Sequence, residues 1–313
     1  MDIMILAGGL SHERDVSVRS GRRVLEELKA AGHRVSMHDV DQNLIPSLRD
    51  LGDGVVWPLL HGASGEDGSL QALLELVGVP FVGTGSKEAR VAWTKPVAKA
   101  VIARAGVTTP DFVTLPQSLF REVGAEHVLD AVAARFDFPL VVKPARGGSA
   151  LGVSLVDSRD QLSRAMVHCF AYGDMALIEH AVVGTEVAVS VVGTGDSARV
   201  LSGVEIACEG PYDYDARYNP GRVEYFSPAR LDSAAAAAVE QAALTVHRTL
   251  GLRDLSRIDL IVDADGVPQV LDVNIAPGMT ETSLFPQAAE AAGGSLAEMY
   301  RDIATAAIER AGS

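Results

Sequence analysis

Short apolar runs alternate with helical spacings along the first third of the chain. Bounded runs of this length predict buried strands, at residues 3–7, 35–40 and 55–60. Between the first two runs, apolar and small residues recur on one helical stripe from Val18 to Leu28, which ends near Gly32. A second helix is predicted over residues 70–77, ended by Gly78. This alternation predicts a parallel sheet with functional loops after its strands.

The rest of the chain predicts further strands, closed by helices. Strands are expected at residues 139–143, 152–156, 175–179, 186–192, 198–206, 256–262 and 267–273. Helices are expected at residues 97–105, in the segment that ends near Phe170, at residues 234–250 and twice at the C-terminus. A polar segment rich in Gly, Pro, Asp and Tyr, from Cys208 to Glu224, interrupts this pattern and is a candidate lid.

Composition and charge narrow the class of protein to which the chain can belong. A length of 313 residues predicts two or three domains, and 48% hydrophobic residues are enough for a core. The formal charge of −14 argues against nucleic acid as a partner, because phosphates call for a basic surface. No export signal or membrane segment is expected. Cys169 and Cys208 lack disulfide or metal-site spacing, so they are expected to be reduced thiols of a cytoplasmic protein.

The strongest local signal is a lysine that ends a predicted strand and precedes a glycine-rich turn, Lys143-Pro144-Ala145-Arg146-Gly147-Gly148-Ser149-Ala150-Leu151-Gly152. Backbone N–H groups approach phosphate oxygens closely where side chains are absent, and the lysine adds a point charge. The pattern differs from the Walker loop, in which Gly-Lys-Ser/Thr opens a helix. Phosphate binding and an ordinary β-turn are both compatible with it.

Acidic residues near the ends of two late strands form the second signal. Arg257-Ile258-Asp259 lies on one predicted strand and Asp272-Val273-Asn274 ends the next. If these strands pair, two carboxylates and an amide oxygen project to one side, and these are hard ligands suited to Mg²⁺. The alternative is a solvated strand end. Pro277-Gly278 follows directly, and a turn of this kind can aim an N–H group at a developing oxyanion.

Taken together, these segments resemble the D-alanine–D-alanine ligase family of the ATP-grasp superfamily. The resemblance runs in order over nearly the whole chain. Its His-Gly-x-x-Gly-Glu-Asp-Gly block from His61 and its Pro-Gly-Met-Thr block from Pro277 are specific to that family. The other anchors are residues 7–9, 13–17, Lys95, 143–152, 178–179, Glu186, 212–218, 257–259, Asn274 and 283–284.

The resemblance implies two sets of ligand-binding residues. Those implied for ATP are Lys95 and Lys143 at the phosphates, the turn at Gly148, Glu179 at the base, Glu186 at the ribose, and a hinge with Ala181 and Val183. The residues implied as Mg²⁺ ligands are Asp259, Asp272 and Asn274. The resemblance implies two Mg²⁺ ions, for which Mn²⁺ can substitute.

The resemblance also implies how two D-alanine molecules bind. Glu13, Ser149 and Tyr218 correspond to a hydrogen-bonded set around the first D-alanine, with Glu13 on its ammonium group. His61 and Arg217 are implied near the substrates. Arg257 and the Gly278 N–H are implied at the acyl phosphate and the tetrahedral intermediate. Ser283 and Leu284 are implied at the carboxylate of the second D-alanine. Acyl phosphate formation needs charge neutralisation and the exclusion of water, which the cations and a lid supply.

Several positions depart from the family pattern. The departures are Asp272 for glutamate, Arg217 for lysine, Gly147 for glutamate, Ala150 for serine, and Pro96 after Lys95. Two alternatives therefore stay open: a ligase with another acceptor, such as an amino acid or D-lactate, and a nucleotide-binding protein without catalysis. Tyr218 argues against D-lactate, because ester-forming members carry histidine in that region. The retained Lys143 and Arg257 argue against loss of catalysis.

The expected fold is α/β (α+β). A parallel-sheet domain over residues 1–94 precedes a two-lobed ATP-grasp fold, with a central lobe over 95–180 and a C-terminal lobe with the metal site over 181–313. The expected activity is ATP- and Mg²⁺-dependent formation of D-alanyl-D-alanine for peptidoglycan precursors, by a cytoplasmic homodimer with no membrane or nucleic-acid partner.

Overall fold

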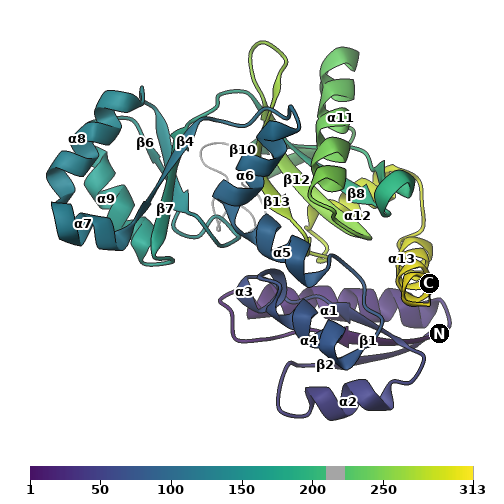
Figure 1. Cartoon of the computed structure of the whole chain (residues 1–313). Helices are drawn as coiled ribbons and strands as arrows, with labels where there is room; N and C mark the ends of the chain where they lie inside the picture. The colour runs from purple at the N-terminus through teal and green to yellow at the C-terminus, as the bar shows by residue number, and fades with distance from the viewer. Residues whose placement is uncertain (209–222, 313) are drawn as a thin grey trace.

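The computed structural model describes residues 1–208 and 223–312 and contains three sheets (Figure 1). Arg217, Tyr218 and most of the predicted lid lie outside these ranges. Within them, no helix combines the length and the apolar character that crossing a bilayer requires.

The first sheet is parallel, as predicted, with the strand order β2-β1-β3. Its strands are β1 (Asp2–Leu6), β2 (Arg34–His38) and β3 (Val55–Pro58). The helices of this region are α1 (Arg14–Ala30), α2 (Leu44–Asp50), α3 (Ala63–Glu66), α4 (Ser69–Val77) and α5 (Ser86–Trp93). Because parallel strands end at the same edge, the loops after β1 and β3 lie together, and they carry Glu13 and His61.

The second sheet is antiparallel, with the order β4-β7-β5-β6. Its strands are β4 (Phe112–Pro116), β5 (Leu140–Pro144), β6 (Ser154–Val156) and β7 (Met175–His180). The helices α7 (Gln117–Val123), α8 (Ala125–Arg135) and α9 (Arg159–Phe170) cover one face of it. Strands and helices share a hydrophobic core of their own, so this lobe is a separately packed layer of sheet and helix.

The third sheet is antiparallel, with the order β11-β10-β8-β12-β13 and a short β9 beside β8. Its strands are β8 (Thr185–Val192), β9 (Arg199–Val200), β10 (Val204–Cys208), β11 (Val223–Phe226), β12 (Leu255–Val262) and β13 (Pro268–Asn274). The helices α6 (Lys95–Arg104) and α11 (Ser233–Thr249) pack on it. The Asp232 carboxylate begins α11 by accepting the N–H groups of Ala234 and Ala235, each at 2.9 Å.

A further core joins the two ends of the chain. The helices α12 (Leu284–Ala291) and α13 (Leu296–Ala311) follow β13, and α13 packs against α1 and β3. Trp57 on β3 meets Tyr300 on α13 edge to face, with ring centroids 5.4 Å apart. Both rings are buried together with Ile5 of β1, so the N-terminal sheet and the last helix form one packed unit.

One predicted strand is wrong. Residues 198–206 were expected to form a single strand, but β9 and β10 are separate. Both pair with β8, and the register shifts by one residue between them: Val200 lies opposite Val191, whereas Val204 lies opposite Ala188. An extra residue of this kind is a bulge, which an apolar pattern alone does not reveal.

Candidate active site

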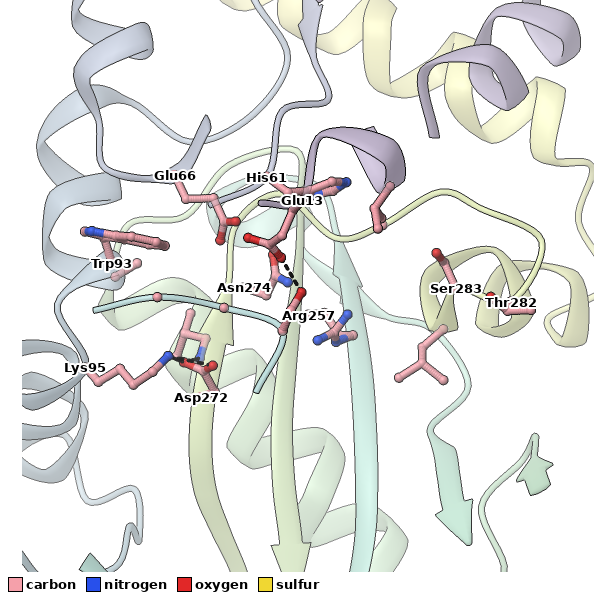
Figure 2. Close-up of a pocket in the computed structure, with 18 residues that line it drawn as sticks. Glu13, His61, Glu66, Trp93, Lys95, Arg257, Asp272, Asn274, Thr282 and Ser283 are labelled. Atoms are coloured by element: carbon pink, nitrogen blue, oxygen red, sulfur yellow. Dashed lines mark hydrogen bonds and ion pairs between the residues drawn. The ribbon is translucent and has the colours of Figure 1, made fainter. Parts of the chain in front are cut away.

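Loops from all three sheets converge on a small pocket, called here the central pocket (Figure 2). Its volume is about 70 Å³. Its walls are the loops after β1 and β3, the glycine-rich turn after β5, the ends of β12 and β13, and the loop before α12. The predicted site residues that line it are Glu13, His61, Lys95, Gly148, Ser149, Arg257, Asp272, Asn274, Gly278, Ser283 and Leu284.

Glu13 and Ser149 meet in this pocket, although they come from different sheets. The Ser149 hydroxyl donates to the Glu13 carboxylate, as the resemblance implied for two of its three residues. The third residue, Tyr218, and the neighbouring Arg217 lie outside the described residues.

His61 is a buried, neutral imidazole beside this pair. Burial, together with the positive charge of Arg257, lowers the pKa of His61 to about 4, although a hydrogen bond to the backbone of Ala276 favours the protonated ring. The Nε2 atom of His61 lies 3.5 Å from the Ser20 hydroxyl. At neutral pH the ring therefore serves as a hydrogen-bonding group without charge.

Glu66 is a pocket residue that was not predicted from the sequence as a site residue, although it belongs to the block that begins at His61. Its Oε1 atom accepts the N–H group of Gly62 at 2.8 Å. An added Cβ at Gly65 would lie 2.0 Å from the carbonyl oxygen of Leu60, so only glycine lets α3 pack this closely. Burial, together with the negative charge of Glu13, raises the pKa of Glu66 to about 8.

Glu66→Gln is expected to change how stability depends on pH. A raised pKa means that the folded protein holds a proton that the unfolded chain releases above about pH 4.5. The contribution of Glu66 to the free energy of unfolding is therefore complete below pH 4.5 and is lost as the pH rises toward 8. The difference in free energy of unfolding between the glutamine variant and wild type should therefore shift in favour of the variant by on the order of 2 kcal/mol when the pH is raised from about 6 to about 8.

Chemical denaturation of both proteins at the two pH values measures this difference. Glu122→Gln, at an exposed residue of α7, controls for the loss of one carboxylate. Parallel pH curves for wild type and Glu66→Gln would contradict the raised pKa.

The ends of β12 and β13 bring the predicted metal ligands together. The two strands pair, as expected, with Asp259 opposite Asp272 and Arg257 opposite Asn274. Arg257 binds Asp259 through two hydrogen bonds, from Nε at 2.7 Å and from Nη2 at 2.8 Å. Lys95 Nζ lies 2.7 Å from both carboxylate oxygens of Asp272 (Figure 2). Each carboxylate is thus paired with a basic side chain.

A larger cleft lies between the second and third sheets, next to the central pocket. Its volume is about 970 Å³. The predicted residues that line it are Lys95, Lys143, Gly148, Ser149, Glu179, Glu186, Asp259 and Asp272. In the predicted hinge, Val182 and the preceding His180 line the cleft, whereas Ala181 and Val183 do not, and Val183 is 81% exposed.

Lys143 is fixed at the cleft wall by a buried group of charges. The Glu179 carboxylate binds Lys143 on one side and Lys99 on the other, where Lys99 Nζ to Glu179 Oε2 is 2.6 Å. Although burial alone would raise it, the two lysines together lower the pKa of Glu179. Lys143 Nζ also donates to the carbonyl oxygen of Leu271 at 3.2 Å, which links the two lobes. Glu179 was predicted as a site residue from the sequence, whereas Lys99 was not.

The glycine-rich turn has a left-handed backbone at several positions. Gly147 has φ of +128°, Ser149 +49° and Ala150 +57°. The φ of Gly147 is rare for any residue with a side chain, so the glycine that replaces the usual glutamate suits the backbone here. The turn places Gly148 and Ser149 at the junction of the central pocket and the cleft.

The donor set at the strand ends fits a magnesium ion. Among residues 1–208 and 223–312, no three His, Cys, Asp or Glu side chains gather as a metal site. Asp259, Asp272 and Asn274 instead offer two carboxylates and an amide oxygen on neighbouring strands, at the edge of a cleft large enough for a nucleotide. Mg²⁺ commonly takes one or two carboxylates and completes its shell with water and phosphate oxygens.

Comparison with known proteins gives a consistent result. The family model described as D-ala D-ala ligase C-terminus matches residues 101–305, and the one described as D-ala D-ala ligase N-terminus matches residues 45–84. A D-alanine–D-alanine ligase from Halalkalibacterium halodurans is 39% identical over 99% of this chain and 100% of its own length.

Solved structures agree. The D-alanine–D-alanine ligase from Bacillus anthracis is 28% identical with a TM-score of 0.85, over 100% of this chain and 99% of that one. The structure of the Bacillus anthracis enzyme complexed with ATP is 27% identical with a TM-score of 0.82, over 99% of this chain and 98% of that one. The VanG D-Ala:D-Ser ligase from Enterococcus faecalis is 25% identical with a TM-score of 0.83, over 98% and 99%.

Two antiparallel lobes around a lysine-lined cleft, beside a small pocket with paired acidic and basic groups, define an ATP-dependent ligase of the ATP-grasp type. This confirms the predicted fold class and the predicted kind of enzyme. The chain belongs to the D-alanine–D-alanine ligase family.

Proposed function

We propose that this enzyme joins two molecules of D-alanine, with ATP as the source of the phosphoryl group and ADP and phosphate as the other products. The observation that carries the proposal is the small central pocket, which opens beside a large cleft with lysines at the junction. With a volume of about 70 Å³ the pocket is small, which favours small substrates such as D-alanine over bulky amino acids. In bacteria the product serves peptidoglycan precursor synthesis, as the family membership implies.

The first amino acid binds with its ammonium group at Glu13, and its carboxylate points toward Arg257. A carboxylate oxygen attacks the γ-phosphorus of ATP in the cleft, and ADP leaves. Lys95 and Lys143 lie at the cleft wall, where they offset the charge of the phosphates. When bound, Mg²⁺ held by Asp259, Asp272 and Asn274 would supply further charge neutralisation to the phosphate oxygens.

The second amino acid binds toward Ser283 and Leu284 on the other side of the pocket. Its ammonium group first loses a proton to solvent, and the amine nitrogen then attacks the acyl carbon. The resulting oxyanion collapses as the carbon–oxygen bond to phosphate breaks, and the nitrogen gives up a second proton, which the released phosphate takes, as the amide forms. Arg257 and the Gly278 N–H line the pocket between the two amino acids and donate to the oxyanion. Glu66 and the neutral His61 complete this wall.

The test is a panel of amino acids and hydroxy acids with purified enzyme, ATP and Mg²⁺. D-alanine alone is expected to release phosphate and to form the D-alanyl-D-alanine dipeptide in equal amounts. D-serine and D-lactate, each mixed with D-alanine, test the acceptor, and L-alanine is the control. The proposal fails if saturating D-alanine yields neither dipeptide nor ADP while another pair does.

We further propose the division into domains at residues 1–94, 95–180 and 181–313, and a homodimer in the cytoplasm. Cys169 and Cys208 are both free thiols, which suits a reducing compartment. Sedimentation equilibrium tests the oligomeric state, and limited proteolysis tests the domain boundaries.

A further inference from the structure

One face of α1 carries a row of polar side chains at a spacing of three residues, Ser17, Ser20 and Arg23. Ser17 Oγ accepts the Gly8 N–H at 2.8 Å and donates to the carbonyl oxygen of Leu59 at 2.7 Å. The row begins one turn after Glu13, so the same helix that presents Glu13 also binds the neighbouring loops. Its last two members, Ser20 and Arg23, reach a loop more than 250 residues away in the chain.

That loop precedes α12 and carries the groups implied for the second amino acid. Ser20 Oγ accepts the N–H of Met279 at 3.0 Å, and Arg23 Nη1 donates to the carbonyl oxygen of Thr280 at 2.8 Å. Arg23 Nη2 also binds Glu290 Oε1 on α12 at 2.9 Å. A single guanidinium therefore connects α1 to the loop and to the helix behind it.

The Thr280 carbonyl is part of the turn that holds Ser283. It accepts the Ser283 N–H at 3.0 Å, while the Thr280 N–H donates to Ser283 Oγ at 2.9 Å. Arg23 binds the same carbonyl oxygen, and its side chain is only 19% exposed, so the contact is well shielded from water. A hydrogen bond from a charged donor is stronger than a neutral one.

We propose that Arg23 is a positioning residue for the second amino acid. It holds the turn at Thr280 so that Ser283 and the adjacent pocket wall face the acceptor carboxylate. Arg23 does not line the central pocket, and its hydrogen bonds go to Thr280 and Glu290, on the side of the second amino acid. This inference depends on the proposed ligation of two amino acids.

The experiment compares two acceptors for the same acyl phosphate. The dipeptide requires a second D-alanine whose carboxylate is held near Ser283. Hydroxylamine has no carboxylate, and it converts the acyl phosphate into the hydroxamate with release of phosphate. Arg23→Gln is expected to raise the KM of the second D-alanine about tenfold, with formation of the hydroxamate unchanged.

Three further variants sharpen the test. Arg23→Lys retains the charge and is expected to restore part of the affinity. Glu290→Gln removes the negative charge from one partner of Arg23 but leaves the Thr280 contact, so it should raise the KM less than Arg23→Gln does. Arg22→Gln, at the exposed neighbour on α1, is the matched control and should leave both rates unchanged.

An unchanged KM for the second D-alanine in folded Arg23→Gln overturns the inference. So does an equal loss of dipeptide and hydroxamate, since that result describes a residue that only supports the fold. If Arg23→Gln does not fold, Arg23→Lys and Glu290→Gln decide by the same comparison. Failure of the wild-type enzyme to form any dipeptide from D-alanine would instead refute the proposed function.

Discussion

Lys143→Met should lower the rate of dipeptide formation by about 10²–10³-fold while the protein remains folded. The lysine lines the cleft proposed for ATP, where the proposed mechanism requires phosphate charge to be offset. The fold should tolerate the change because Lys99 stays paired with Glu179, so no uncompensated carboxylate is left buried. Steady-state kinetics with varied ATP, alongside thermal unfolding, measures both effects.

Lys99→Met is the matched control. It also leaves one lysine on Glu179, but Lys99 is 3% exposed and lies away from the cleft surface. The loss of turnover should therefore be much smaller than for Lys143→Met. Near-normal turnover in folded Lys143→Met, or equal losses in both variants, would remove the phosphate assignment from Lys143.

Asp272→Asn should raise the Mg²⁺ concentration needed for half-maximal turnover at least about tenfold. Despite burial, Lys95 and Lys143 lower the pKa of Asp272, so this side chain supplies a negative charge at neutral pH. Asparagine keeps the shape but removes that charge, and Mg²⁺ prefers anionic oxygen ligands. Titration with Mg²⁺ during turnover, and direct Mn²⁺ binding measured by calorimetry, report the change.

Asp272→Glu is the informative companion, because it restores the side chain usual in the family. The glutamate variant should keep the wild-type Mg²⁺ dependence or improve on it. If Asp272→Asn retains the wild-type midpoint and affinity, Asp272 is not a ligand and serves only as the partner of Lys95.

Much of the fold could be predicted from the sequence because its elements carry clear local signals. The parallel pairing of β1 with its neighbours followed from bounded apolar runs, and the helix that ends at Gly78 followed from a residue suited to its left-handed φ of 78°. The strand β4 and the helices α7 and α8 were not predicted. All five residues of β4 are half-buried, so no strict alternation of apolar and polar residues identifies it.

The residues of the candidate site were predicted from sequence motifs, but their protonation states and charge pairing were not. The pairing of β12 with β13 was expected, and the register confirms that Asp259 and Asp272 face each other. The buried proton of Glu66 and the two-sided pairing of Glu179 depend on contacts between distant segments. Such contacts exist only after folding, and a single sequence without relatives contains no sign of them.

The packing of Tyr300 against Trp57 affects how the chain folds during synthesis. The N-terminal sheet leaves the ribosome before the other two sheets, yet part of its apolar surface is covered by α13, which follows all three sheets in the chain. Until then the nascent sheet exposes that surface, and such intermediates are prone to aggregation. The central lobe, with a core of its own, is free to fold as soon as β7 has emerged. The N-terminal sheet is therefore made before the other two sheets but covered only after both of them have emerged.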